Sequence, residues 1–223
     1  MNVKGKSGLG KEKSNTAAGT PAWVWSTFVL CSLVLINMMF PQYESKTFIM
    51  SWGDNTFGQV GVGKFGYECS PLTVTGIDGI INVSAGGSHT IVVQDSGKVF
   101  SWGDNFFGEL GNGTTQDASS PQQMSYFSNA VSISGGYTHS LILMDDGTVM
   151  ACGDNWAGQL GNGSETRSVV PVLVSGLSGA ISVAGGGYHS LALRDDGTVW
   201  AWGYNGSGQL RGGTRVSSRV PGK

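Results

Sequence analysis

The chain has 223 residues, of which 39% are hydrophobic, 13% are charged and 37 are glycine. This composition suits one large globular domain, and about one glycine in six residues without a collagen-like period indicates many tight turns. Residues 1–21 hold four lysines and one glutamate, which leaves nine basic and fourteen acidic residues, a net charge of −5, in residues 22–223. A nucleic-acid partner is therefore not expected.

The N-terminus consists of a basic tail followed by an apolar segment. Residues 1–21 are predicted to be flexible, and residues 22–41 are predicted to form a transmembrane signal-anchor helix. Residues 22–40 carry no charge, and a helix of that length spans about 28 Å, close to the ~30 Å hydrocarbon core of a bilayer. Lysines on the N-terminal side predict a single-pass protein with the remainder outside the cytoplasm. A cleaved signal peptide, which would give a secreted protein, and a buried core helix remain alternatives.

Residues 45–223 form a repeat region with a period of fifty residues. Its landmarks recur without insertion or deletion, and a fixed period of this length indicates a repeat architecture. The positions in register are Trp52, Trp102, Cys152 and Trp202; Asn55, Asn105, Asn155 and Asn205; Pro71, Pro121, Pro171 and Pro221; and His89, His139 and His189.

Each unit shows the signals of short strands. Two apolar runs flank an Asp/Ser/Gly turn in "HTIVVQDSGKVFSWG" and "HSLILMDDGTVMACG", as in β-hairpins. A further strand is expected before the glycine-rich entry, and an outer strand is expected to begin at the proline. The predicted fold is all-β, a partial β-propeller of about 3.5 four-stranded antiparallel blades, preceded by an N-terminal apolar helix.

Glycine and tryptophan have different roles in this prediction. Gly86, Gly136 and Gly186 are expected where inner strands approach closely, and Trp52 and Trp102 are expected to fill the wider gaps between sheets.

The segment "GGYTHSLILMDDGTVMACGDNWAGQLGNG" closely resembles the repeat of the regulator of chromosome condensation family, and the resemblance covers residues 48–223. It implies a β-propeller, usually seven-bladed, with roles from guanine-nucleotide exchange on a small nuclear GTPase to protein binding. The regular fifty-residue spacing leaves no room for the wedge-like insertion expected of the nuclear exchange factor. Unclosed propeller edges predict self-association.

Several motifs are better explained by blade construction than by chemistry. The loop "GVGKFG" lacks the following helix that a phosphate site needs. The three histidines are equivalent in separate blades and are expected to bond to backbone, not to share a metal. Paired aspartates before Gly147 and Gly197 are typical of hairpin turns. Cys152 replaces a tryptophan and is interpreted as a buried packing residue. No catalytic residue, cofactor or metal is expected.

A binding surface is sought where the copies differ within a fixed loop. The pair between the invariant Asn and Gly varies from copy to copy, and large aromatic residues there are typical interface anchors. The alternative is that these rings pack against the adjacent blade. The candidate protein-binding residues are Phe106, Phe107 and Trp156, with Tyr67 and Arg167 on the following loops.

The function predicted from the sequence is a non-enzymatic protein-binding scaffold, displayed from a membrane through residues 22–40. The alternative is a regulator of a small GTPase that resembles a guanine-nucleotide exchange factor. An extracytoplasmic enzyme would need convergent polar residues unique to one copy, and the sequence offers none.

Overall fold

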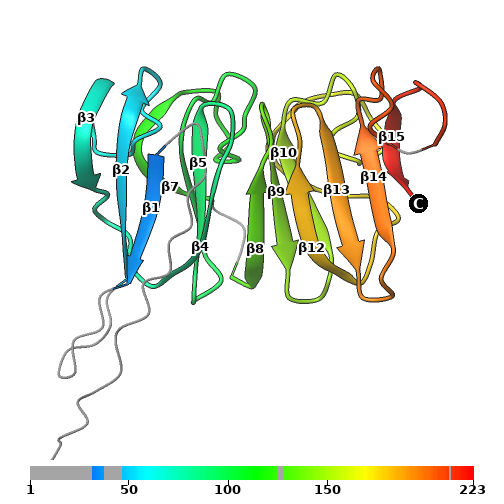
Figure 1. The fold of residues 1–223 in the computed structure, drawn as a ribbon, viewed down its shortest axis with the longest axis horizontal. Coiled ribbons are helices and arrows are strands. Elements are labelled where there is room, and N and C mark those ends of the chain that lie inside the picture. Colours follow the sequence, from blue (N-terminus) through cyan, green and yellow to red (C-terminus); the bar gives the residue numbers. More distant parts are fainter. Residues whose placement is uncertain (1–31, 38–46, 125–127, 211) are drawn as a thin grey trace, which may run out of the picture.

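The computed structural model describes residues 32–37, 47–124, 128–210 and 212–223. The regular secondary structure in these ranges consists of β-strands alone. These fifteen strands form four antiparallel sheets, which confirms the all-β prediction (Figure 1). Their bounds are β1 Ser32–Asn37, β2 Thr47–Asn55, β3 Gly66–Thr73, β4 Ile80–Ala85, β5 His89–Gln94, β6 Val99–Gly103, β7 Ala118–Gln123, β8 Ala130–Gly135, β9 His139–Met144, β10 Val149–Gly153, β11 Ser168–Leu173, β12 Ala180–Gly185, β13 His189–Arg194, β14 Val199–Gly203 and β15 Ser218–Gly222.

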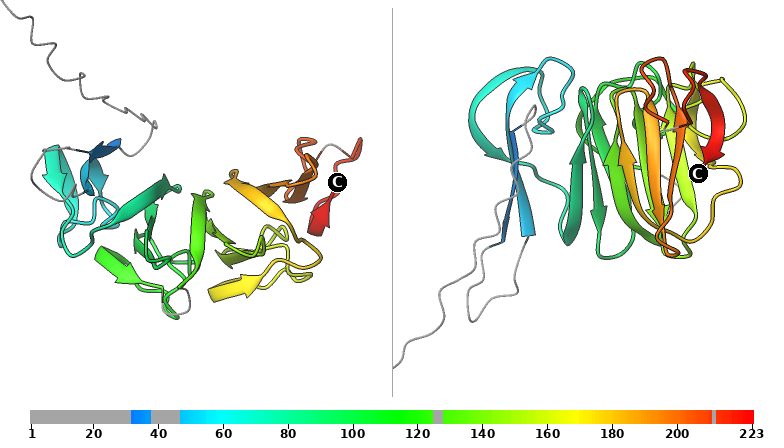
Figure 2. Two further views of the ribbon diagram at one scale, coloured as in Figure 1. Left: turned by 90° about the horizontal axis from the view of Figure 1, so that it is seen from below. Right: turned by 45° about the vertical axis from the view of Figure 1, so that its right-hand side comes forward.

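Three sheets have four strands in sequence order, β4 to β7, β8 to β11 and β12 to β15, and the first sheet is β1-β2-β3. Each four-stranded sheet thus uses one fifty-residue unit, as the hairpin pattern predicts, whereas the first sheet takes β1 from residues before the predicted repeat region. Figure 2 shows the sheets following one another along an arc, in the manner of propeller blades. The fold is therefore a partial β-propeller.

The glycine-rich entries lie where neighbouring sheets approach most closely. A Cβ built on Gly86 would lie 2.7 Å from the Gly136 carbonyl oxygen and would also meet the His89 ring. One built on Gly136 would lie 2.8 Å from the Gly186 carbonyl oxygen. A side chain at these positions would separate the inner strands, so the predicted role of these glycines is confirmed.

Large side chains fill the space between sheets. Trp102 and Trp202 are fully buried, and each indole Nε1–H donates to a backbone carbonyl of the preceding sheet, at 2.9 Å in both cases. Cys152 occupies the equivalent gap in the third sheet, where the longer side chain of Met124 replaces the valine found in the other units. The buried packing role predicted for Cys152 is thus confirmed.

The outer strands differ from the prediction at one point. Pro121 and Pro171 lie inside β7 and β11 and do not begin them. The pairing of β6 with β7 and of β10 with β11 is irregular at this level of the sheet. Because these are edge strands with an irregular ladder, a residue without an N–H is tolerated there.

The predicted helix over residues 22–41 needs a correction for six residues, because Ser32–Asn37 form strand β1, paired antiparallel with β2. Ser32 lies opposite Trp52 in this ladder, in the register that places Ser140 opposite Cys152 and Ser190 opposite Trp202. The apolar run therefore supplies the strand that β9 and β13 supply in later units. The rest of the predicted helix, residues 22–31 and 38–41, and the basic tail, residues 1–21, lie outside the described residues. Within the described part, the structure contains no helix with the length and hydropathy that a membrane crossing requires.

Candidate functional site

The loops after β2, β6, β10 and β14 share one scaffold, which explains the invariant asparagine. The Asn105 Oδ1 accepts the Leu110 N–H at 3.0 Å, and its Nδ2 donates to backbone carbonyls of Thr114 and Gln116. Asn155 repeats this arrangement one unit later. Because this side chain ties both halves of the loop together, the two residues that follow it are presented at a fixed place.

Two of the variable residues on this scaffold point into solvent. Phe106 is 64% exposed and Trp156 is 53% exposed. Phe107 is half-buried and contacts Phe106 edge to face, with ring centroids 4.9 Å apart. The rings of Phe106 and Trp156 are therefore not buried between sheets.

Trp156 belongs to a larger group, here termed the aromatic cluster and consisting of Tyr137, Trp156, Tyr188 and Tyr204. The ring centroid of Trp156 lies 5.7 Å from that of Tyr188 and 5.5 Å from that of Tyr204. The ring centroids of Tyr137 and Tyr188 are 5.8 Å apart. Tyr188 and Tyr204 come from the fourth unit and Trp156 from the third. The cluster thus bridges two sheets at the end where the β12–β13 and β14–β15 loops lie (Figure 1).

The three tyrosines of the cluster are not among the residues predicted from the sequence. Tyr204 stands where the other units have aspartate, and Tyr188 stands where they have serine or threonine. Both tyrosines differ from the residues at the same position of the other units, and this difference can be read from the sequence. Their contact with Trp156 cannot, because it depends on two sheets lying side by side.

The other predicted residues lie apart from the cluster. The Arg167 guanidinium donates to the Phe106 carbonyl oxygen at 3.3 Å, so these two predicted residues meet. Tyr67 is 76% exposed on β3 of the first sheet, and no contact of the described residues joins it to the others.

Three carboxyl groups lie among these loops. Asp154, only 6% exposed, accepts the Thr138 hydroxyl at 3.3 Å and the Asn155 N–H at 2.8 Å. Asp104 accepts the Phe106 N–H at 3.0 Å, and burial raises its pKa. Glu109 is 1% exposed, and burial, with the charges of Asp104 and Asp154, raises its pKa to about 7. None of the three belongs to the ion pairs among the described residues, and the Arg167 guanidinium lies on the same loops.

The histidines join neighbouring sheets, which corrects the expectation of backbone bonds within each blade. His89 Nε2 lies 3.0 Å from Ser140 Oγ, and His139 Nε2 lies 2.9 Å from Ser190 Oγ. Each serine hydroxyl donates to a backbone carbonyl, so Nε2 must carry the proton that the serine oxygen accepts. Burial lowers the pKa of His89 to about 4 and that of His139 to about 3, which keeps both rings neutral.

The paired aspartates and the glycine-rich loop that the sequence offered as possible sites form turns and loops of the blades in the described residues. Asp146 and Asp196 each accept the N–H and hydroxyl of the threonine two residues later, as hairpin turns require. The "GVGKFG" loop leads into strand β3 and not into a helix. Among the described residues, no three His, Cys, Asp or Glu side chains gather as a metal site would require.

Comparison with known proteins gives one family. The model described as the regulator of chromosome condensation (RCC1) repeat matches residues 49–93, 96–143 and 146–193. A second model with the same description matches residues 80–109, 130–159 and 180–209. Together they cover more than half of the chain.

Two curated proteins match over about one unit. The ultraviolet-B receptor UVR8 of Arabidopsis thaliana is 43% identical over 54 residues, which are 23% of this chain and 12% of that protein. The probable E3 ubiquitin-protein ligase HERC3 of Homo sapiens is 43% identical over 53 residues, which are 22% of this chain and 5% of that protein.

Solved structures match over most of the chain. Human WBSCR16 gives a TM-score of 0.71 at 28% identity, covering 85% of this chain and 51% of that one. Yeast RCC1 (Prp20), solved with Kap60, gives 0.68 at 22% identity, covering 89% and 50%. The chain thus spans about half the length of these structures and a small fraction of the curated relatives.

Proposed function

Because the chain belongs to the regulator of chromosome condensation repeat family, we propose that it is a non-enzymatic propeller that binds a protein partner. The aromatic cluster, with Phe106 and Phe107 one unit earlier, anchors that partner. The observation that carries the proposal is that Trp156 is 53% exposed although it contacts two tyrosines of the next unit. Solvent-exposed aromatic rings in mutual contact are rigid anchors, and such residues dominate the energy of many interfaces.

The charges around these rings indicate the chemistry of the partner. Asp104 accepts the Phe106 N–H and is only half-buried, so its carboxylate accompanies that ring, whereas Asp154 beside Trp156 is 6% exposed. The face of an aromatic ring attracts guanidinium and ammonium groups. A segment rich in arginine or lysine meets both groups and is the partner class that this surface favours.

The test measures binding and folding separately. A fluorescently labelled arginine-rich peptide is titrated with the full chain, and a glutamate-rich peptide of equal length is the control ligand. Trp156→Ser is expected to weaken binding of the arginine-rich peptide by about tenfold or more while the melting temperature stays within a few degrees. Val216→Ser, which removes a side chain that is 74% exposed on the loop before β15, is the matched control variant. Equal binding by both variants would contradict the assignment of the anchor.

Display from a membrane through residues 22–40, with the repeats outside the cytoplasm, is a separate proposal that rests on the sequence. Strand β1 provides the competing arrangement, because Ser32–Asn37 cannot pair with β2 and cross a bilayer at once. Full-length protein that stays with membranes after an alkaline carbonate wash would favour the anchor. Full-length protein recovered in the soluble fraction would exclude it.

The exchange-factor alternative rests on the family alone. The likeness to yeast RCC1 is at 22% identity and concerns the fold. No residue described in this chain is assigned to a GTPase, so the partner-binding proposal is preferred.

A further inference from the structure

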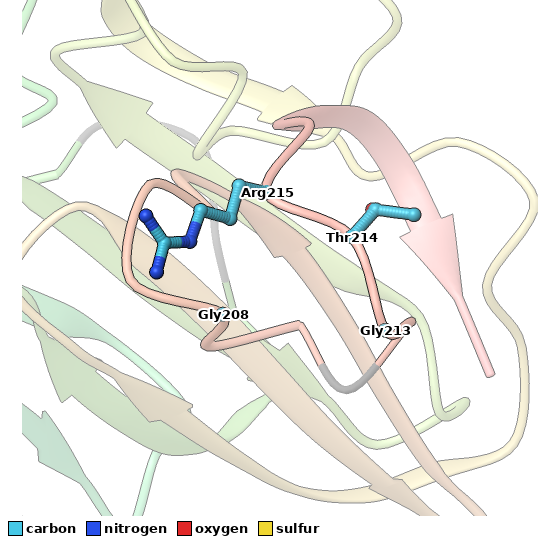
Figure 3. Close-up of a pocket in the computed structure, with 4 residues that line it drawn as sticks. All are labelled: Gly208, Gly213, Thr214 and Arg215. Atoms are coloured by element: carbon cyan, nitrogen blue, oxygen red, sulfur yellow. The ribbon is translucent and has the colours of Figure 1, made fainter.

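A pocket of about 450 Å³ opens on the loop that joins β14 to β15, where Gly208, Gly213, Thr214 and Arg215 line it (Figure 3). Its described lining carries one guanidinium and neither an aromatic ring nor a carboxylate, so this pocket offers a basic partner no attraction. The aromatic cluster has the opposite character, because its four rings lie beside the carboxylate of Asp154.

The exposed rings of the aromatic cluster lie at a junction that the structure describes on both sides. Trp156 is 53% exposed and Tyr137 is 58% exposed. Both belong to the sheet β8 to β11, which lies between the sheets of the second and fourth units (Figure 2). The two rings therefore remain exposed with a neighbouring sheet in place on each side.

The rings of the cluster meet at angles and do not stack face to face. The interplanar angle is 67° between Tyr137 and Tyr188, 64° between Trp156 and Tyr188, and 48° between Trp156 and Tyr204. Inclined rings leave part of their faces uncovered, and the face of an aromatic ring is its electron-rich side. Several electron-rich faces are thus available within one small area of the surface.

Two glycines make room for rings of the cluster. A Cβ built on Gly206 would lie 2.9 Å from the Tyr204 Cε2, and one built on Gly87 would lie 2.8 Å from the Tyr137 Cδ2. Threonine, phenylalanine and tryptophan occupy the position of Gly206 in the other units. Because both tyrosine rings lie against backbone, their positions are restricted before a ligand arrives, which reduces the entropy lost on binding.

The carboxylate beside Trp156 supplies charge but little hydrogen-bonding capacity. Asp154 Oδ1 accepts the N–H groups of Asn155 at 2.8 Å and Trp156 at 3.4 Å, and its Oδ2 accepts the Thr138 hydroxyl at 3.3 Å. Asp154 is 6% exposed and belongs to none of the ion pairs among the described residues. Its charge attracts a cation, while its oxygens already have donors from the protein.

A cation without N–H groups fits this combination of rings and charge. An ammonium or guanidinium group loses hydrogen bonds to water when it moves onto aromatic faces, and this cost is offset only where other acceptors replace the water. A trimethylammonium group donates no hydrogen bond, keeps its positive charge and is recognised by groups of aromatic rings. The aromatic cluster therefore matches trimethylammonium better than it matches an unmodified lysine.

We propose that the aromatic cluster is a site for the trimethylammonium group of a methylated lysine within the basic segment of the partner. This assignment rests on the protein-binding function proposed above and adds the side chain that the cluster selects. The faces of the rings contact the methyl groups, and the charge of Asp154 adds attraction at longer range.

Peptides that differ at one side chain test this assignment. The full chain in mild detergent is titrated against a labelled lysine-rich peptide that carries, at one position, trimethyllysine, lysine or an uncharged isostere of trimethyllysine in which carbon replaces the nitrogen. The trimethyllysine peptide is expected to bind about tenfold more tightly than the unmodified peptide. The uncharged isostere should lose most of this gain, because it keeps the shape and removes the charge.

Three variants locate the preference for trimethyllysine. Trp156→Ser should reduce the ratio of the two affinities by about fivefold or more, because it removes the central ring. Gly206→Ala should also reduce the ratio, because its methyl group displaces the Tyr204 ring, and Gly206 is not among the glycines with positive φ, so alanine brings no backbone strain. Phe65→Ser removes a ring that is 57% exposed on the loop before β3, and this matched control should keep the ratio. Melting temperatures report the folding of each variant.

The possible outcomes separate this assignment from the function on which it rests. Equal binding of the trimethyllysine and unmodified peptides would overturn the assignment and leave the protein-binding function in place, whereas no binding of any basic peptide would contradict both. A ratio that neither Trp156→Ser nor Gly206→Ala changes would also overturn it. Trp156-dependent binding to phosphatidylcholine vesicles without binding of the peptides would assign the cluster to a lipid head group instead of a protein.

Discussion

Replacing Glu109 with glutamine should stabilise the protein above neutral pH. The other three units have glutamine at the position equivalent to Glu109, namely Gln59, Gln159 and Gln209. The Glu109 Oε2 accepts the Phe107 N–H at 2.9 Å, and Gln159 makes the equivalent bond through an amide oxygen at 3.0 Å. Glu109→Gln therefore keeps the bond and removes a charge that burial disfavours.

The pKa of Glu109 sets the size and the pH window of this effect. Folding raises the pKa from 4.5 to about 7, so the folded protein binds more protons than the unfolded chain between these values. Stability consequently falls as the pH rises from 4.5 to about 7 and stays low above that. At about 1.4 kcal/mol per pKa unit, the loss approaches about 3 kcal/mol.

Urea unfolding of both proteins at acidic and alkaline pH provides the measurement. Glu109→Gln should exceed the wild type by up to about 3 kcal/mol at pH values about one unit above 7, and should match it below 4.5. Gln159→Glu is the reciprocal control and should introduce a similar loss at high pH. A Glu109→Gln advantage that does not change with pH would refute the assignment to carboxyl ionisation.

Four further substitutions test how neighbouring sheets pack. Cys152→Trp should destabilise the protein by about 1–3 kcal/mol through overpacking, and Met124→Val should recover much of that loss in the double variant, as thermal melting of the four proteins would report. Ser190→Ala should cost about 1–3 kcal/mol because it leaves the His139 N–H without its acceptor, and an unchanged melting temperature would exclude that bond as a stabilising contact. Gly86→Ala should reduce soluble, folded protein, since its methyl group would press on a backbone carbonyl of the next sheet, and normal yield and circular dichroism would contradict this.

The repeat period was sufficient to predict the blades because its signals are local. The Asp-Gly hairpins and the two apolar runs around them lie within about fifteen residues of each other, so they can be identified in one unit. The glycine entry could also be predicted, because a propeller requires its inner strands to converge.

The interactions between sheets were harder to predict because they join residues about fifty positions apart. The bond from His139 to Ser190 depends on which sheet follows which, and so does the contact of Trp156 with Tyr204. Strand β1 was missed because its apolar run lacks the Asp-Gly turn that identifies the other hairpins. The length of the uncharged run, residues 22–40, then favoured a membrane helix. The hydrogen-bonded pairing with β2 instead places Ser32–Asn37 in a sheet.

The proposed binding face is tested most directly by hydrogen–deuterium exchange of the full chain with and without an arginine-rich peptide. The peptide should protect the loops that carry the aromatic cluster, residues 136–138, 154–158, 186–189 and 203–207, with little change in the hairpin turns at 145–148 and 195–198 at the opposite end of the sheets. Protection of the hairpin turns, or no protection of the aromatic loops at saturating peptide, would contradict a partner site at this face.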